Sequence, residues 1–251
     1  MEIKDCVALV TGGNRGIGEA FVRALLEAGA RKVYVGSRDP ASAAHLAAAD
    51  PRCVALELDV TDFGEVEAAA RKCGDVNVVV NNAGLFANQT LLGAADMSIA
   101  RAEMEVNFFG VLAMCRAFAP VLKRNGGGAI VNVLSAAGIA CLPNMGGYSP
   151  SKAAARFLTT SVRAELAEQG TQVTALIVGS VDTRMAAHVE GTKEKPEDIA
   201  RAGLKAIRHR IDELDTDRMA VEVRAAIQLD PKGFEKRLAK MLHATTVRTG
   251  R

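Results

Sequence analysis

The sequence predicts an α/β protein with a doubly wound parallel sheet of about six strands, helices on both faces of the sheet and a helical C-terminal tail. Short β-branched runs alternate along the chain with Ala-, Leu- and Glu-rich stretches whose apolar residues recur at helical spacing. The β-branched runs are apolar almost throughout, which is typical of parallel strands covered on both faces. In order, these predicted strands are 6–11, 32–37, 53–60, 76–82, 129–135 and 172–179.

Helices are expected between and after these strands, because a parallel sheet needs a crossover after each strand. The helical stretches are 16–29, 40–49, 62–73, 98–124 and 149–169. After the sixth strand the chain shows no strand pattern, only charged helical stretches at 197–214, 216–229 and 231–243. We therefore expect a single domain over 1–251, with a substrate lid at 184–215 and a helical C-terminal extension at 216–251.

Composition excludes several classes of protein. The chain has 251 residues, of which 49% are hydrophobic, so it is long enough to bury a sizeable core. Its 31 basic and 29 acidic residues give a net charge of +2, too small an excess to attract nucleic acid or a membrane surface. No apolar run reaches the roughly 18 residues of a membrane-spanning helix.

The cysteines and the N-terminus indicate a cytoplasmic protein. Five cysteines are an odd number, and they are widely spaced without a CxxC pair, which argues against a disulfide framework and against a zinc site. The opening MEIKDC lacks the charged, apolar and small-residue regions of a signal peptide. We expect reduced thiols, no bound metal and a cytoplasmic location.

A glycine-rich turn follows the first strand, in the sequence TGGNRGIG at 11–18. Gly12, Gly16 and Gly18 permit a tight turn and a close approach of the backbone to a diphosphate, while the following helix N-terminus favours negative charge. The spacing differs from that of a P-loop, and no Lys-Ser or Lys-Thr follows, which disfavours an ATPase or GTPase. The alternative is a helix-entry loop without a ligand.

Two arginines predict which dinucleotide binds. Arg38 follows the second strand directly after Ser37, where an acidic residue would bind the ribose of NAD, and Arg15 lies inside the glycine turn. A guanidinium offers a planar fork of donors to a 2′-phosphate, so the pair favours NADPH or NADP+ over NADH. The alternative is that both are solvated surface residues and that Asp39 binds the ribose.

Four polar residues form a candidate catalytic group. Tyr148 and Lys152 are four apart at the start of a helix, so they share one face, and an adjacent ammonium would lower the pKa of the phenol. Ser135 ends the fifth strand at the same sheet edge as the glycine turn, and Asn107 is an amide among apolar neighbours. Singly, each also has a purely structural explanation, whereas Tyr34, the other tyrosine, is assigned to packing.

With these motifs in this order, residues 5–185 resemble the short-chain dehydrogenase/reductase family, of the short single-domain type with a Rossmann-like fold. The resemblance implies that Tyr148 is the general acid/base, Lys152 lowers its pKa and binds the nicotinamide ribose, Ser135 orients the carbonyl and Asn107 holds a water. It also implies the following cofactor-binding residues: Gly12, Asn14, Arg15, Gly16, Ile17, Gly18, Ser37, Arg38, Asp59, Val60, Asn81, Ala83, Gly84, Tyr148, Lys152, Gly179, Val181 and Thr183.

The chain departs from the family pattern in two places. Val178-Gly179 replaces the usual Pro-Gly after the sixth strand, which makes the nicotinamide contact there less secure. The usual C-terminal strand with its Asp-Gly-Gly ending is missing, so we expect a sheet of six strands and no tetramer interface of the usual kind. Pairing through the helices at 98–124 and 149–169 predicts a homodimer.

These observations predict an NADPH-dependent carbonyl reductase that is reversible as an alcohol dehydrogenase. An apolar wall at 136–143, together with Met145, predicts a hydrophobic ketone or aldehyde as substrate. One alternative is a reductase of 3-oxoacyl thioesters, for which Arg184, Lys193 and Lys195 would attract a carrier phosphate. Another alternative is a non-enzymatic NADP(H)-binding signalling protein.

Overall fold

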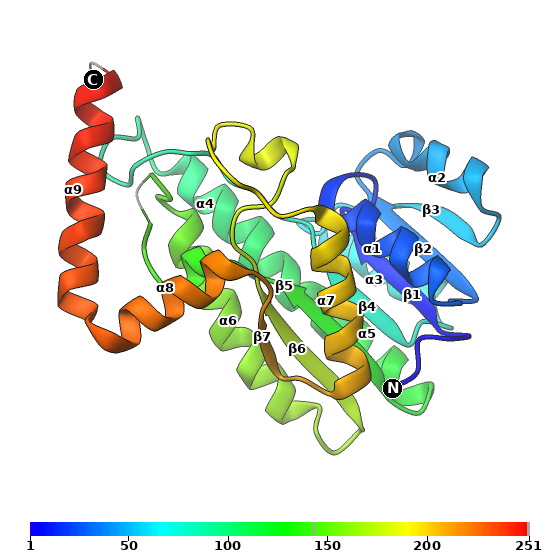
Figure 1. Cartoon of the computed structure of the whole chain (residues 1–251). Coiled ribbons are helices and arrows are strands. Elements are labelled where there is room, and N and C mark those ends of the chain that lie inside the picture. The colour runs from blue at the N-terminus through cyan, green and yellow to red at the C-terminus, as the bar shows by residue number, and fades with distance from the viewer. Residues whose placement is uncertain (143, 250–251) are drawn as a thin grey trace.

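Seven parallel strands form the central sheet of the computed structural model (Figure 1). The structure describes residues 1–142 and 144–249, with side chains to residue 242. The strand order is β3-β2-β1-β4-β5-β6-β7, and every neighbouring pair is parallel. The strands are β1 (Val7–Thr11), β2 (Lys32–Ser37), β3 (Cys53–Glu57), β4 (Val78–Asn81), β5 (Gly128–Val133), β6 (Thr171–Ile177) and β7 (Glu213–Asp215). The predicted doubly wound parallel sheet is thus confirmed.

The predicted number of strands was one too low. β7 pairs with β6 in the register Ala175 to Glu213 and Ile177 to Asp215, within a segment that the sequence pattern assigns to a helix. Only Leu214 of its three residues is apolar, and all three are half-buried. A strand this short and this charged lacks the apolar run by which the other six are recognised.

Ion pairs hold β7 in place. Arg224 of the following helix bonds Asp215 through two N–H groups at 2.6 and 2.7 Å, and it contacts Glu213 Oε1 at 2.7 Å. Arg156 donates two hydrogen bonds of 2.9 Å to the same Glu213 carboxylate. Side chains from two helices therefore reinforce the pairing of β7 with β6.

Helices cover both faces of the sheet, as predicted. Those described are α1 (Gly16–Glu27), α2 (Ala44–Ala49), α3 (Phe63–Lys72), α4 (Ser98–Met104), α5 (Gly110–Arg124), α6 (Tyr148–Glu165), α7 (Pro196–His209), α8 (Arg218–Leu229) and α9 (Pro231–Thr249). On one face α1 and α7 bury Phe21, Leu25 and Ile199 against the strands. On the other face α3, α5 and α6 bury a second cluster that includes Phe118 and Leu122. Burial of each such side chain contributes about 1.5–3 kcal/mol.

The stretch predicted as one helix over 98–124 consists of three parts. A π-helical turn, Glu105–Phe109, separates α4 from α5. By length and composition alone, Ser98–Arg124 is apolar enough to cross a membrane, but 44% of its most apolar window is buried inside the protein. Because Met114 and Phe118 are fully buried against the sheet, this is a core helix.

The C-terminal region is helical except for β7. The predicted helix at 197–214 ends earlier, since α7 stops at His209 and Arg210 adopts a left-handed conformation with φ of 54°. α8 and α9 follow and lie at the end of the molecule opposite α2 (Figure 1). α8 packs beside the end of β6, where Ala220 and Val223 join a third apolar cluster with Ile177.

Candidate active site

The glycine turn joins β1 to α1 at the carboxyl edge of the sheet. Gly12 and Gly16 have φ of 60° and 55°, a region that favours glycine. A Cβ on Gly18 would lie 2.1 Å from the carbonyl oxygen of Gly12, so no larger residue fits there. No side chain caps the N-terminus of α1, where Arg15 is the N-cap residue. Its free N–H groups are thus available to an anion.

Thr11 and Asn82 tie this turn to the end of β4. The Thr11 hydroxyl accepts hydrogen bonds from the backbone N–H groups of Asn82 and Ala83, both at 3.0 Å. Asn82 Nδ2 in turn donates to the carbonyl oxygen of Gly12 at 3.1 Å. Neither residue was among the predicted site residues, although Thr11 begins the glycine-rich motif and Asn82 lies between the predicted residues Asn81 and Ala83. Their role is to fix the turn that contains Ala83 and Gly84 beside the glycine turn.

The predicted 2′-phosphate residues lie at the end of β2 and in the glycine turn. Arg15 and Arg38 are exposed, and neither forms an ion pair with the side chains described, those of residues 1–142 and 144–242. The Asp39 carboxylate, by contrast, accepts a hydrogen bond of 3.0 Å from Ala41 N and caps the short helix that follows. Ser37 donates to the Asp39 carbonyl oxygen at 2.8 Å. Both arginine side chains are therefore available to a ligand at this position.

Other predicted cofactor residues follow β3 and β4 or lie within the glycine turn. Asn14 donates to Ser42 at 2.9 Å, and Ile17 packs against the apolar core. Asp59 accepts two hydrogen bonds from Thr61, whereas Val60 is buried. Asn81, also buried, donates to Asn132 at 2.8 Å, while its Oδ1 atom has no partner among the described residues.

The segment after β6 returns to the glycine turn. A Cβ on Gly16 would lie 3.3 Å from Thr183 Cγ2, so Thr183 lies against the turn. Val181 is buried and forms an isolated parallel bridge with Glu194. Gly179 N–H donates to Asp217 Oδ2 at 2.7 Å, and the same carboxylate caps α8. Asp217, which sequence reasoning missed, thus holds this segment to α8.

The predicted catalytic residues meet at the start of α6. Helix α6 begins at Tyr148, and Lys152 lies one turn later with Nζ 5.7 Å from the centre of the Tyr148 ring. Lys152 is buried and donates to the carbonyl oxygen of Val133, at the end of β5, at 2.9 Å. Ser135, two residues beyond Val133, interacts with Tyr148 by a hydrogen bond that lowers the pKa of the phenol.

The electrostatics of Tyr148 differ from the sequence expectation. Burial raises the pKa of Tyr148 to about 12, more than the bond to Ser135 lowers it, and the charge of Glu103 raises it further. Burial also lowers the pKa of Lys152 to about 8. Desolvation therefore sets the direction of the Tyr148 pKa shift, and the lowering that we expected from Lys152 is not among its causes.

Asn107 lies in the π-helical turn and is fully buried. Its Oδ1 accepts from the Leu85 N–H at 2.9 Å, and its Nδ2 donates to the Leu85 carbonyl oxygen at 2.8 Å and to Ser151 at 3.0 Å. A Cβ on Gly84 would lie 3.2 Å from Asn107 Oδ1 and 3.7 Å from Lys152 Nζ. Asn107 therefore fixes the turn after β4 next to the catalytic group, as π-helical turns often do at functional sites.

Two aromatic residues near Tyr148 were not predicted. Phe86 packs edge-on against the Tyr148 ring, with centroids 5.1 Å apart at an interplanar angle of 66°. His188, from the segment after β6, lies 5.3 Å from the Phe86 ring. A Phe two residues beyond the Asn81–Gly84 turn carries no sequence signal of its own, because its partners are distant in the chain.

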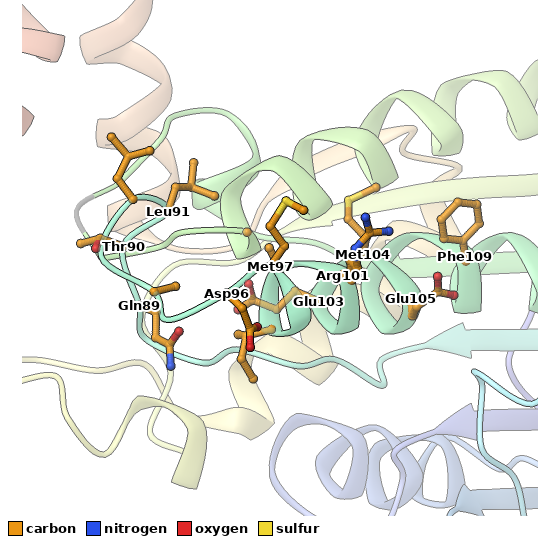
Figure 2. A pocket seen from close by; sticks show the side chains of 15 residues that line it. Gln89, Thr90, Leu91, Asp96, Met97, Arg101, Glu103, Met104, Glu105 and Phe109 are labelled. Atoms are coloured by element: carbon orange, nitrogen blue, oxygen red, sulfur yellow. The ribbon is translucent and has the colours of Figure 1, made fainter.

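A pocket of about 630 Å³ lies beside this group, between α4 and the loop that precedes it (Figure 2). Its wall includes apolar side chains such as Leu91, Met97 and Met104, together with the charged Glu103. Gly147, directly before Tyr148, also lines it. The pocket therefore reaches the N-terminal end of α6.

The glycine turn, the turn after β4, Ser135 and Thr183 all follow carboxyl ends of parallel strands, so they share one edge of the sheet. A doubly wound protein with these groups at that edge is an oxidoreductase of the class that interconverts alcohols and carbonyl compounds. The chain belongs to the short-chain dehydrogenase family, whose sequence pattern matches residues 6–194.

Related proteins support this assignment. A short chain dehydrogenase from Burkholderia cenocepacia, solved in complex with NADP, is 43% identical and superposes with a TM-score of 0.90 over 95% of this chain and 99% of its own. A 3-ketoacyl-(acyl-carrier-protein) reductase from Brucella melitensis, complexed with NADH, is 26% identical with a TM-score of 0.79 over 86% and 99%. The 3-alpha-(or 20-beta)-hydroxysteroid dehydrogenase of Mycobacterium bovis is 35% identical over 202 residues, 79% of this chain and 75% of its own.

Proposed function

We propose that this protein is an NADP(H)-dependent carbonyl reductase, reversible as an alcohol dehydrogenase, with Tyr148 as its general acid/base. The observation that carries the proposal is the convergence of Tyr148 and Lys152 beside the turn after β4, at the sheet edge where Ser135 follows β5. Lys152 Nζ is fixed to the Val133 carbonyl oxygen, and the interaction with Ser135 lowers the pKa of the Tyr148 phenol. These groups offer a proton donor, a cation and a second hydroxyl to one small molecule.

The residues at the sheet edge fit a dinucleotide. The tight glycine turn, in which the Gly12 carbonyl oxygen packs directly against Gly18, and the uncapped N-terminus of α1 suit a diphosphate. Thr183, which lies against Gly16, would contact the nicotinamide end. The remaining predicted contacts, from Asp59 to Gly84, line the same edge. When bound, the cofactor supplies or accepts the hydride.

The protein's own part in the reaction is to orient the carbonyl group and to move a proton. Ser135 would donate to the substrate oxygen and hold it near the Tyr148 hydroxyl, which gives its proton to that oxygen during reduction. Lys152, as an ammonium, would stabilise the phenolate that remains. Asn107 keeps the Leu85 backbone and Ser151 in place around Lys152, and the water predicted beside it would return the proton from solvent.

Substitution of Tyr148 by Phe tests the chemical role. Tyr148→Phe should lower carbonyl reduction at least about 100-fold, the typical contribution of a positioned acid/base, and leave NADPH binding unchanged. Tyr34→Phe is the matched control, because the only other tyrosine lies within β2 and pairs with Lys32 and Asp75 away from this site. Full activity of Tyr148→Phe would exclude the assignment, and NADPH binding without turnover by the wild type would favour the non-enzymatic alternative.

The preference for NADP(H) rests on Arg15 and Arg38, which are exposed and unpaired within the described residues, and on the use of Asp39 as a cap. The complex of the Burkholderia cenocepacia relative with NADP supports it. Titration with NADPH and with NADH, followed by nicotinamide fluorescence, should give clearly tighter binding of NADPH. A preference for NADH would assign the ribose to Asp39 instead.

The substrate proposed is a hydrophobic ketone or aldehyde. Ala136 and Ala140 are buried and Leu142 is half-buried in the predicted apolar wall, whereas Pro143 lies outside the described residues. Residues 184–215 remain the proposed lid, and within them 196–209 form α7, which packs on the sheet, so movement would belong to 184–195. A ketone series of increasing apolar size should show falling KM.

Reduction of a 3-oxoacyl thioester is the second candidate. It is favoured by the ketoacyl reductase among the relatives and by the exposed side chains of Arg184 and Lys195, which would meet a carrier phosphate. Lys193 is less available, since it donates to the Ala186 carbonyl oxygen at 2.9 Å. Turnover of acetoacetyl thioesters at a much higher kcat/KM than simple ketones would select this function.

We also propose a cytoplasmic homodimer that pairs through α5 and α6. Phe109 and Phe157, at 39% and 74% exposure, are large apolar side chains at the surface of this helical region. Sedimentation equilibrium should give twice the mass of 26.4 kDa, and Phe157→Glu should return the protein to a monomer.

A further inference from the structure

Glu103 is a buried carboxyl group next to Tyr148 that the proposed reaction does not use. Its side chain is only 3% exposed, although glutamate is rarely buried without a partner. It lies on α4 four residues before Asn107, so the two side chains share the face of this helical segment that meets α6. Figure 2 shows Glu103 among the residues that line the pocket.

Two contacts hold this carboxyl group. Oε1 accepts a hydrogen bond of 2.9 Å from the backbone N–H of Ala87. Oε2 lies against Gly147, since a Cβ at that position would come within 2.7 Å of it. The side chain thus bridges the segment after β4 and the N-cap residue of α6, and only a glycine at 147 leaves room for it.

The bond to Ala87 also positions an aromatic ring. Phe86 directly precedes Ala87, and its ring packs edge-on against Tyr148. Fixing the Ala87 N–H therefore fixes the backbone that carries Phe86 over the proposed proton donor. Loss of this bond would leave Phe86 free to move away from Tyr148.

The charges around Tyr148 come from several elements. Lys152 lies on α6 itself, Glu103 on α4, and His188 reaches Tyr148 through Phe86. Asp96, Arg101 and Glu105 line the same pocket as Glu103. Burial raises the pKa of Glu103, and its negative charge raises the pKa of Tyr148, opposite in sign to the effect of an ammonium.

We propose that Glu103 is a positioning residue that holds Phe86 against Tyr148 and whose negative charge keeps the Tyr148 phenol protonated, the form that donates a proton to a carbonyl oxygen. The inference rests on the proposed role of Tyr148. A site with Lys152 alone would favour the phenolate, which accepts a proton from an alcohol. With Glu103 present, Tyr148 keeps its proton at higher pH.

Glu103→Gln is the decisive variant, because an amide oxygen can still accept from Ala87 while the charge is removed. The matched control is Glu105→Gln, on the adjacent turn and lining the same pocket, but exposed. The chain has two tyrosines and no tryptophan, so a Tyr34→Phe background leaves Tyr148 as the one phenol to titrate. Its phenolate absorbance is followed with rising pH in the complex with NADP+, with circular dichroism as a check on folding.

We expect Glu103→Gln to move the Tyr148 titration about one pH unit lower, the usual effect of one nearby charge, and Glu105→Gln to leave it unchanged. At a fixed pH below the titration, kcat for alcohol oxidation, which needs the phenolate, should rise up to about tenfold. An unmoved titration in folded Glu103→Gln would overturn the proposal. Because this readout needs no substrate turnover, it is independent of whether the proposed substrate class is correct.

Glu103→Asp provides a second test, since it keeps the charge and shortens the reach to Ala87. We expect the Tyr148 titration to stay near that of the wild type while KM for the carbonyl substrate rises severalfold through the release of Phe86. A titration shifted as far as in Glu103→Gln would contradict the electrostatic part of the proposal, and an unchanged KM would contradict the positioning part.

Discussion

Arg224 is the guanidinium group that binds both acidic residues of the seventh strand, so Arg224→Ala should destabilise the protein. Arg224 makes contacts of 2.6 and 2.7 Å with Asp215 and of 2.7 Å with Glu213. The three side chains are 24%, 16% and 25% exposed, so water screens these contacts only in part. Removal of Arg224 leaves two half-buried carboxylates with Arg156 as the remaining cation bound to Glu213.

The size of the effect follows from this partial burial. A hydrogen bond to a charged group contributes about 1.5–3 kcal/mol when buried, and an exposed ion pair less than about 1 kcal/mol, so we expect a loss of about 2–3 kcal/mol in total. For a protein of this size, that loss lowers the melting temperature by roughly 4–12 °C. Scanning calorimetry at neutral pH measures it. Arg218→Ala is the control, because Arg218 is 87% exposed and, among the side chains described, pairs only with Glu222, one turn along the same helix.

The same contacts predict a pH dependence. Burial alone would raise the pKa of Glu213, but Arg156 and Arg224 outweigh it and hold the pKa below its usual 4.5. When folding lowers the pKa of a carboxyl group, the ionised group stabilises the fold at any pH above its pKa in the unfolded state. This stabilisation is lost as the pH falls through its pKa in the folded state. The difference in melting temperature between wild type and Arg224→Ala should therefore be full at neutral pH and should shrink below about pH 4.5. Equal melting temperatures at neutral pH would refute the argument.

Three further variants probe the site. Arg38→Ala should weaken NADPH binding about 10- to 100-fold and leave NADH binding unchanged, because it removes a charge-assisted contact to the 2′-phosphate. Fluorescence titration measures both affinities, and equal losses for the two cofactors would contradict that role. Since the pKa of Lys152 is about 8, kcat/KM for carbonyl reduction should fall as the pH rises past that value, and Lys152→Met should abolish this inflection. Phe86→Ala should raise KM for apolar ketones about two- to tenfold through loss of the aromatic contact, and an unchanged KM would place Phe86 outside the substrate site.

The six predicted strands and the missed seventh differ in what stabilises them. Strands such as Val78–Asn81 and Thr171–Ile177 are buried at every residue, so their composition alone identifies them. β7 contains one apolar residue, Leu214, and is fixed by Arg156, which lies 57 residues away from Glu213 in the chain. A single sequence contains no sign of such a long-range ion pair.

The candidate site also contains both residues that the sequence predicts and residues that it does not. Tyr148 and Lys152 are one helical turn apart, so their proximity follows from spacing. Glu103 could have been noticed as an acid on the inner face of a helix, four residues before Asn107, but its partners at Ala87 and Gly147 come from other segments. The pKa of Tyr148 was expected to fall and is instead raised, because burial cannot be estimated from spacing.

The Asp217 carboxylate couples the segment after β6 to the start of α8. It bonds the Gly179 N–H on one side and the Ala220 N–H at the start of α8 on the other. Any molecule that orders the segment from Gly179 to Thr183 also restrains α8, which contributes none of the predicted binding residues. Amide hydrogen exchange at the start of α8 will therefore slow when the dinucleotide binds. Shortening the chain before residue 217 would release the same segment from its anchor.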